Sequence, residues 1–222
     1  MAERARAAVA ADAGRESAMA QTPRAADAST RRQRLLDALA VAVEQRGFRQ
    51  VTVADVVRIA RTSRRTFYEH FGDREACFLA LFEQVTQSML EQIAAAVDPR
   101  LPWQRQVDAA IDAYLAALAG RPALHRSFVR ELPALGEAAA ERQREVTERF
   151  ASMLVELVQA ARRAHPRTIR RALPHDVAVV IVAGLRELLV SSLQQRRDPA
   201  EMRESARLVV RALVRELLSP AG

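Results

Sequence analysis

The chain has 222 residues, of which 50% are apolar, 5% aromatic and 27% charged. Its single cysteine, Cys77, excludes an internal disulfide and indicates a reduced, cytoplasmic protein. The formal charge of +7 favours an anionic partner, although the absence of lysine and asparagine also fits the bias of a GC-rich genome.

The N-terminal region gives no sign of a signal peptide, because charged residues interrupt every apolar run. Residues 1–28 are rich in alanine and lack an apolar face, which predicts a mobile tail. The most apolar segment, 177–193, is short for a membrane span and contains Arg186 and Glu187. It predicts a buried helix, and no contact with a membrane is expected.

Three short helices are expected in residues 29–75. The first begins at Ser29 or Thr30 and ends before Gly47. The second begins at Thr52, which has Asp55 three residues on, close to a capping box. The third covers residues 63–71, only about three residues after the second ends. Two short helices joined by a tight turn predict a helix-turn-helix, whose second helix can lie in a DNA major groove.

Longer helices are expected in residues 76–222. Asp73 caps a helix that runs to about residue 97, and proline recurs near the start of later helices, where it is tolerated. Those later helices are expected at 102–119, 122–132, 136–165, 174–195 and 199–218. The fold class is therefore all-α, with a helix-turn-helix domain at 29–75 and a larger helical regulatory and dimerisation domain at 76–222.

The segment "RTSRRTFYEHF" (61–71) concentrates aromatic rings and positive charge. Phe67 and Phe71 share one helical face and are expected to pack inward, which leaves the hydrogen-bonding side chains outward. Arginine near the helix start can bind guanine with two donors, and Tyr68 and His70 can donate to phosphates; a structural hydrogen bond is the alternative for His70. Residues 31–74 hold ten arginines and five acids, a net +5, so the excess charge lies in this region.

The longer segment "RTSRRTFYEHFGDREACFLALFEQ" resembles the TetR/AcrR family of one-component transcriptional regulators over roughly residues 31–85. Ser63, Thr66, Phe67, Tyr68, His70, Phe71 and Glu75 stand at the family's offsets. Arg61 and Arg65 depart from it, since the family often has glycine there. The resemblance implies a homodimer on double-stranded operator DNA, with a basic residue, here Arg74, on a phosphate. The residues expected to contact DNA are Arg31, Thr52, Ser63, Arg64, Arg65, Thr66, Tyr68, His70 and Arg74.

The last two helices are apolar on more than one side, so each needs partners on two sides. One partner is the domain's own core, and a second copy of the chain in a four-helix interface is the simplest other one. The residues expected at this dimer interface are Ile181, Leu185, Leu188, Leu189, Val210, Leu213 and Leu217.

The helices between residues 102 and 165 carry most of the remaining large side chains. The family resemblance implies a pocket for a small-molecule effector between them, whereas aromatic residues at helical spacing also fit a plain core. The residues expected to line such a pocket are Trp103, Tyr114, His125, Phe128, Phe150 and Met153.

An enzyme is not expected, because the four histidines lack partners at metal-ligand spacing and no phosphate loop or nucleophile elbow is present. No metal or cofactor is expected either. The sequence predicts a sequence-specific DNA-binding regulator. It is expected to act as a repressor that a small molecule releases from a palindromic operator. The alternatives are a ligand-independent DNA-binding regulator and a helical protein that binds an acidic protein partner.

Overall fold

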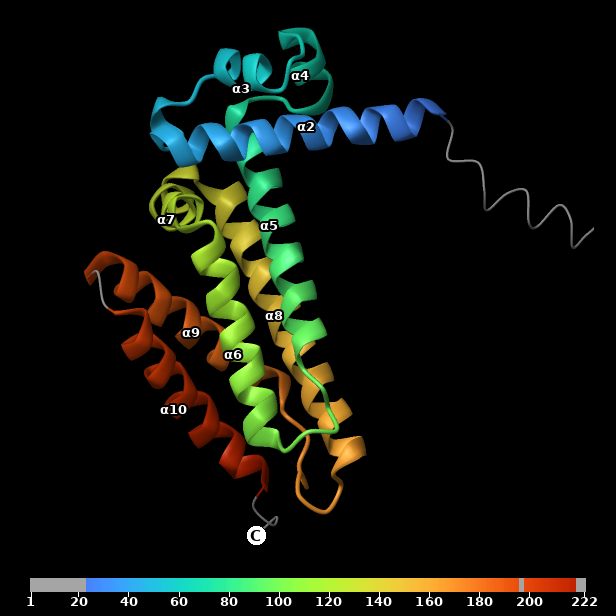
Figure 1. Cartoon of the computed structure of the whole chain (residues 1–222), viewed down its shortest axis with the longest axis vertical. Coiled ribbons are helices and arrows are strands. Elements are labelled where there is room, and N and C mark those ends of the chain that lie inside the picture. Colours follow the sequence, from blue (N-terminus) through green and yellow to red (C-terminus); the bar gives the residue numbers. More distant parts are fainter. Residues whose placement is uncertain (1–22, 196–197, 219–222) are drawn as a thin grey trace, which may run out of the picture.

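The computed structural model describes residues 23–195 and 198–218, and the described chain folds into helices alone (Figure 1). The predicted tail reached residue 28, but the first helix already begins at Pro23; residues 1–22 lie outside the described part. The remaining helices begin close to the predicted starts. The elements are α2 (Pro23–Arg46), η1 (Phe48–Gln50), α3 (Val53–Ile59), α4 (Arg64–His70), α5 (Arg74–Ala96), α6 (Trp103–Gly120), α7 (Pro122–Glu131), η2 (Leu132–Leu135), α8 (Glu137–Ala164), α9 (His175–Gln195) and α10 (Pro199–Leu218).

The molecule is elongated, with the three N-terminal helices at one end (Figure 1). Helix α2 lies across that end, and α3 and α4 cover it on the outside. Helix α5 descends from this group beside α6 and α8, while α9 and α10 pack against the lower part of the bundle. Within the described residues, no helix combines the length and apolar character needed to cross a membrane.

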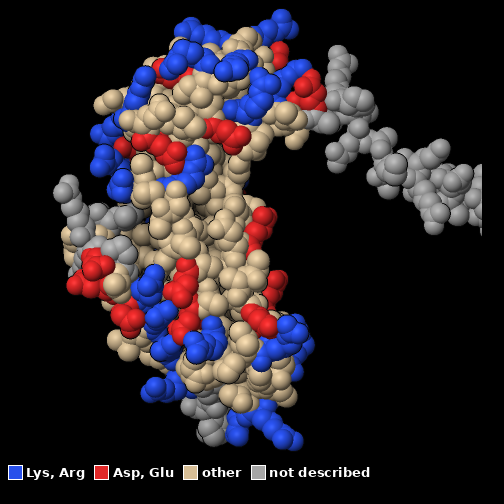
Figure 2. All heavy atoms as spheres, in the orientation of Figure 1, with Lys and Arg blue, Asp and Glu red and all other residues tan. Residues whose placement is uncertain are grey.

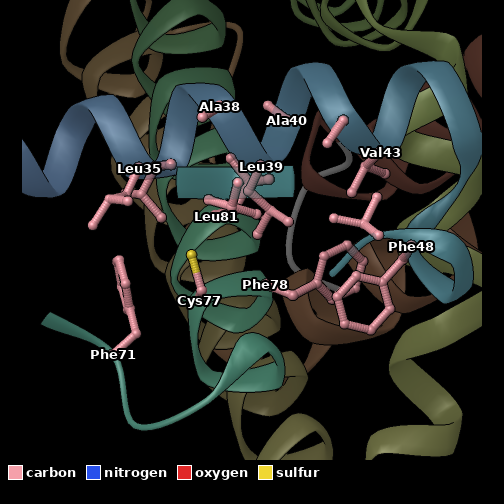
Figure 3. Packing of buried hydrophobic residues seen from close by; sticks show 14 of the residues in the cluster. Leu35, Ala38, Leu39, Ala40, Val43, Phe48, Phe71, Cys77, Phe78 and Leu81 are labelled. Carbon is pink, nitrogen blue, oxygen red and sulfur yellow. The ribbon is translucent and has the colours of Figure 1, made fainter. Parts of the chain in front are cut away.

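One continuous apolar core joins the helix-turn-helix to the rest of the chain. Leu35 and Leu39 of α2 face Cys77 and Leu81 of α5 (Figure 3). Phe78 of α5 stacks on Phe48, with ring centroids 4.0 Å apart. Burial raises the pKa of the Cys77 thiol to about 12, so this cysteine is a packing residue and stays protonated at neutral pH. The predicted domain boundary between residues 75 and 76 therefore lies within a core to which both parts of the chain contribute.

The turn between α3 and α4 has the hydrogen bonds of a Schellman motif. The amide of Thr62 donates to the carbonyl of Val57 (2.9 Å), and the amide of Arg61 donates to the carbonyl of Arg58 (3.3 Å). Arg61 accordingly has φ 51°, a left-handed conformation that favours glycine. The guanidinium of Arg34 donates to the Ala60 carbonyl (3.0 Å) and fastens this turn to α2.

Replacing Arg61 with glycine is expected to raise the free energy of unfolding by about 1 kcal/mol, because glycine takes up this backbone conformation without steric cost. Urea denaturation followed by circular dichroism measures the change. The same replacement at Arg65, which lies inside α4, serves as the matched control and is expected to lower stability by a similar amount. Equal effects at both positions would contradict the assignment of strain to Arg61.

Ion pairs join α10 to α6 beside the apolar side of α10. Arg211 contacts Asp108 (2.5 Å), and Arg207 contacts Asp108 (3.4 Å) and Asp112 (3.1 Å). The neighbouring Val210 is buried in a second core cluster with Ile181 of α9.

The residues predicted at the dimer interface mostly belong to this internal packing. Ile181, Leu189 and Val210 are buried, and Leu185, Leu188 and Leu213 are half-buried against the same core. The side chain of Leu217 lies outside the described part. The large apolar side chains that α9 and α10 leave exposed are instead Val180, Leu208 and Val209, among the described residues. Both helices are apolar on two faces, and the sequence-based prediction selected the inward one.

Candidate nucleic-acid interface and internal cavity

Helix α4 is held to the protein by its aromatic residues. The side chain of Phe67 is fully buried, and Phe71 at the end of the helix is 6% exposed. Their ring centroids lie 5.7 Å apart, and both belong to the core that contains Leu35 and Leu39 of α2. The predicted inward face of α4 is therefore the observed one, and the opposite face is directed to solvent.

Both helices of the helix-turn-helix are capped by hydroxyl side chains. The Oγ1 of Thr52 accepts from the Asp55 amide (3.2 Å), and the Thr52 amide donates to the Asp55 carboxylate (3.1 Å), which completes a capping box. Hydrogen bonds from Thr52 lower the pKa of Asp55. The Oγ of Ser63 accepts from the Thr66 amide (3.0 Å). Thr52, Ser63 and Thr66 thus set the start and direction of α3 and α4, in addition to any contact with DNA.

The outward side of α4 presents the predicted polar residues. Arg64, Arg65 and Tyr68 are exposed, Tyr68 to 57%. Arg65 donates to the Glu69 carboxylate (3.1 Å), so Glu69 partly neutralises it and holds it along the helix. The half-buried His70 lies beside them at the end of α4. The structure therefore brings these five side chains onto one short exposed helix.

Besides Arg65, two of the predicted DNA-contacting arginines already have partners in the protein. Arg31 is exposed on α2 and forms an ion pair with Asp27. The guanidinium of Arg74 donates to the Val51 carbonyl (2.7 Å) and to Glu75 (2.7 Å), and it lies 4.3 Å from the centre of the Phe48 ring. Arg74 was expected on a phosphate, but its observed contacts join the start of α5 to the segment before α3.

Positive charge gathers at the helix-turn-helix end of the molecule (Figure 2). Four arginines there are exposed on α3, on the turn and on α4, and we call them the helix-turn-helix arginines: Arg58, Arg61, Arg64 and Arg65. Arg58 contacts Asp55 at 3.6 Å, which leaves most of its side chain accessible. Exposed guanidinium groups at this density attract phosphate oxygens.

A cavity of about 490 Å³ lies within the helical bundle, and apolar side chains of α5, α6, α8 and α9 form most of its wall. Such a volume and such a lining are typical of sites for small organic molecules. The structure places all six predicted pocket residues on this wall: Trp103, Tyr114, His125, Phe128, Phe150 and Met153. Their binding of a ligand remains a prediction.

Helix α7 separates this cavity from the helix-turn-helix. Phe128 lines the cavity, and its ring also contacts Phe78 of the N-terminal core, with centroids 5.1 Å apart. Two ion pairs join α7 to the N-terminal end: Arg121 with Glu44 (2.8 Å) and Glu131 with Arg49 (2.8 Å). Helix α7 and the residue before it therefore contact both the cavity and the N-terminal end of the molecule.

His125 lies at the same end of the cavity and is 9% exposed. Burial lowers its pKa to about 4, the nearby Arg121 acts in the same direction, and Glu44 opposes it. His125 is therefore neutral in the folded protein at neutral pH. In the unfolded chain the histidine pKa is about 6.5, so acidification protonates the unfolded state first.

The stability that the neutral His125 contributes is expected to be present above about pH 6.5 and to be lost as the pH falls toward 4. Relative to His125→Gln, the wild type should lose about 2–3 kcal/mol between pH 7 and pH 4.5. Urea denaturation of both proteins at the two pH values measures this difference. Parallel losses in the two proteins would mean that His125 does not titrate in this way.

Comparison with known proteins supports the geometry of the N-terminal end. Residues 35–81 match the sequence model of bacterial regulatory proteins of the tetR family. This range contains α3, α4, the second half of α2 and the first turns of α5. The N-terminal domain of the chain belongs to the TetR family. This end of the molecule is accordingly a DNA-binding helix-turn-helix domain of that family.

The rest of this TetR-family chain resembles solved structures of the family in fold. A TetR-family transcriptional regulator from Pectobacterium atrosepticum has a TM-score of 0.66 and 24% identity, covering 89% of this chain and 98% of that one. One from Rhodococcus sp. has a TM-score of 0.64 and 22% identity, covering 86% and 100%. The fatty acid degradation regulator FadR from Bacillus halodurans has a TM-score of 0.61 and 15% identity, covering 80% and 93%.

A curated relative matches a smaller part of the TetR-family chain. The uncharacterized HTH-type transcriptional regulator YxbF from Bacillus subtilis is 23% identical over 87 residues, which are 39% of this chain. The match spans only 23% of that relative's own length.

Several side chains of this TetR-family structure were not predicted to have their observed roles. Arg34 caps the carbonyl end of α3, 26 residues away in sequence, and Arg121 pairs with Glu44 across 77 residues. Local patterns carry no signal for such distant contacts. Val182 and Val190 line the cavity from α9, a helix that the sequence assigned to dimerisation. Their spacing at i and i+8 on an apolar helix could have indicated a shared inner face.

Proposed function

We propose that two copies of this TetR-family chain form a homodimer that binds a pseudo-palindromic DNA operator and represses transcription in the cytoplasm. Each α4 would lie in a major groove, with Arg64, Arg65 and Tyr68 toward base edges and phosphates. A small molecule in the internal cavity would release the DNA. The operator, the repression, the dimer and the ligand are parts of this proposal.

The observation that carries the DNA-binding part is the orientation of α4. Phe67 and Phe71 are buried, so the exposed guanidinium, phenol and hydroxyl groups of this helix point away from the body of the protein. No described element packs over the exposed side of Tyr68, whose side chain is 57% accessible. A duplex could therefore reach this surface without any rearrangement of the domain.

The observation that supports a dimer is the apolar outer face of α9 and α10. Val180 is 65% exposed, Leu208 is 72% exposed and Val209 is 46% exposed. Gly184 on α9 is also exposed, and no side chain covers the space where its Cβ would stand. Small and apolar residues on one outer surface favour close packing against a second copy with two-fold symmetry. This outer face replaces the inward residues of the sequence-based prediction.

Replacing Leu208 with aspartate is expected to convert the dimer into monomers, because a carboxylate would be buried without a partner. Light scattering coupled to size-exclusion chromatography measures the mass. Leu101→Asp is the matched control, since Leu101 is 45% exposed but lies between α5 and α6, away from α9 and α10. A Leu208→Asp variant that keeps the mass of the wild type would contradict the proposed interface.

The proposed ligand effect follows from the position of α7. Phe128 belongs both to the cavity wall and to the core beneath the helix-turn-helix. A ligand that moves Phe128 would shift α7 and, through Glu44 and Arg49, the orientation of the two DNA-binding domains. The cavity of about 490 Å³ favours this interpretation over a ligand-independent regulator with a filled core.

The test of the DNA-binding proposal is a gel-shift assay on fragments upstream of the chain's own gene, followed by footprinting. One fragment is expected to bind much more tightly than the others, with a protected region of two symmetric half-sites about 34–36 Å apart. Affinity should fall steeply with salt, because arginine–phosphate contacts release counterions. Equal binding to all fragments, or no binding at low salt, would contradict a sequence-specific regulator.

A further inference from the structure

The internal cavity is long as well as apolar. Its lining residues on α8 run from Gln143 to Ala161, and those on α5 run from Phe82 to Ile93. At a rise of about 1.5 Å per residue, the α8 wall alone extends over about 27 Å. A volume of about 490 Å³ spread along this length makes a narrow channel, which suits an extended chain better than a compact ring system.

Two polar side chains of the wall donate hydrogen bonds to backbone carbonyls. The amide nitrogen of Gln106 donates to the carbonyls of Leu101 (2.7 Å) and Pro99 (3.1 Å). The hydroxyl of Thr147 donates to the Gln143 carbonyl (3.0 Å). His125 is neutral at physiological pH, as described above. These side chains are uncharged, so they do not by themselves require a charged ligand.

The Tyr114 hydroxyl is a polar group of the wall without such a hydrogen bond among the described residues. Tyr114 lines the cavity from α6, and no hydrogen bond joins its hydroxyl to another described residue. Burial raises its pKa, and the positive charge of Arg186 acts in the opposite direction. The phenol is thus a protonated donor inside an apolar channel, and such a group gains free energy when a ligand supplies an acceptor.

Arg186 of α9 lines the same cavity. Among the described residues no carboxylate forms an ion pair with its guanidinium, whereas Arg203, Arg207 and Arg211 of α10 have acidic partners. Glu187 also lines the cavity, and the positive charge of Arg186 acts on Tyr114. Tyr114 and Arg186 therefore supply two kinds of donor to the cavity, and the Arg186 side chain is also exposed to solvent.

We infer that this channel binds an amphipathic anion, an unbranched apolar chain ending in a carboxylate, with Tyr114 and Arg186 holding the carboxylate and the apolar wall holding the chain. Arginine binds carboxylates with charge-assisted hydrogen bonds, and a phenol donor strengthens such a site. This inference deepens the proposed effector-binding function and rests on the cavity being that effector's site.

The test uses dodecanoate, below its micellar concentration, as the probe with the full-length protein, and isothermal titration calorimetry as the measurement. Dodecanoate is expected to bind at least about tenfold more tightly than dodecan-1-ol or dodecylammonium, because only the carboxylate satisfies both donors. Tyr114→Phe and Arg186→Gln are each expected to weaken dodecanoate binding by about tenfold, and Arg186→Gln should leave dodecan-1-ol binding unchanged.

Glu187→Gln is the matched control, since Glu187 neighbours Arg186 on the same cavity wall. It should not weaken dodecanoate binding. Tighter binding of dodecylammonium than of dodecanoate, or loss of dodecanoate binding in Glu187→Gln but not in Arg186→Gln, would overturn the inference, as would the absence of binding by any of the three chains. Circular dichroism confirms that each variant is folded.

A separate experiment distinguishes a failure of this inference from a failure of the proposed function. Operator affinity is measured by gel shift without any ligand, and Tyr114→Phe should leave it unchanged because Tyr114 lies outside the DNA-binding domain. Normal DNA binding with no carboxylate preference would overturn the ligand class alone. A failure of the wild type to bind any operator would instead contradict the proposed function.

Discussion

Replacing Phe67 with alanine is expected to lower the free energy of unfolding by about 3–5 kcal/mol, the range found for large aromatic residues in protein cores. Phe67 is fully buried and packs against Phe71 at 5.7 Å. Its ring is the main contact between α4 and the core, so operator binding should be lost together with stability. Thermal denaturation and gel-shift titration of the same preparation measure both effects.

Phe67→Leu provides the control for this substitution. Leucine keeps most of the buried apolar volume, so the loss should be less than about 1.5 kcal/mol and operator binding should largely remain. If Phe67→Ala were as stable as the wild type, α4 would have to be held by contacts other than those of its inward face, and the proposed orientation of the helix would be wrong.

Replacing Tyr68 with alanine is expected to weaken operator binding without a large loss of stability. The phenol is 57% exposed and contacts the protein mainly through the edge of the Phe67 ring, 5.4 Å away, so stability should change by less than about 1 kcal/mol. Operator affinity should fall by about tenfold or more, because the proposed contact with DNA is removed. Fluorescence anisotropy with a labelled operator measures the affinity.

Arg65→Ala and Arg170→Ala extend this test. Arg65 lies on the outward side of α4, and its loss should weaken operator binding and reduce the salt dependence by about one phosphate contact. Arg170 is also exposed, and it belongs to the loop between α8 and α9, which lies at the opposite end of the molecule from α4 (Figure 1), so its loss should change neither quantity. Unchanged affinity in both Tyr68→Ala and Arg65→Ala would exclude α4 as the DNA-contacting helix.

Local signals in the sequence predicted the helices and the orientation of α4. Hydroxyl and carboxylate caps at Thr52, Ser63 and Asp73 mark the observed helix starts, because a capping side chain satisfies backbone amides one turn away. The i, i+4 spacing of Phe67 and Phe71 predicted which face is buried. Both signals act within one turn of helix, so they can be recognised without knowledge of the tertiary structure.

Contacts between residues far apart in the sequence could not be predicted from such local signals. Arg74 looked like a free cation at a helix start, but its partner carbonyl at Val51 lies 23 residues earlier. The outward face of α10 could not be chosen from its apolar pattern, because both faces are apolar and the contacts with Asp108 and Asp112 of α6 join residues about 95–103 positions apart. The cavity depends on side chains from several helices, and its existence could be predicted only from the family resemblance.

The position of Phe128 also limits how this protein can diverge. A mutation at Phe128 that changes the shape of the cavity also removes contacts with Phe78. It would therefore lower the stability of the core that supports the helix-turn-helix. Mutations at the far end of the channel, near Ile169 and Ala161, avoid that cost because these residues lie outside the N-terminal core. If the proposed effector binds in this channel, its preference is expected to evolve first at the end of the channel that is remote from the helix-turn-helix.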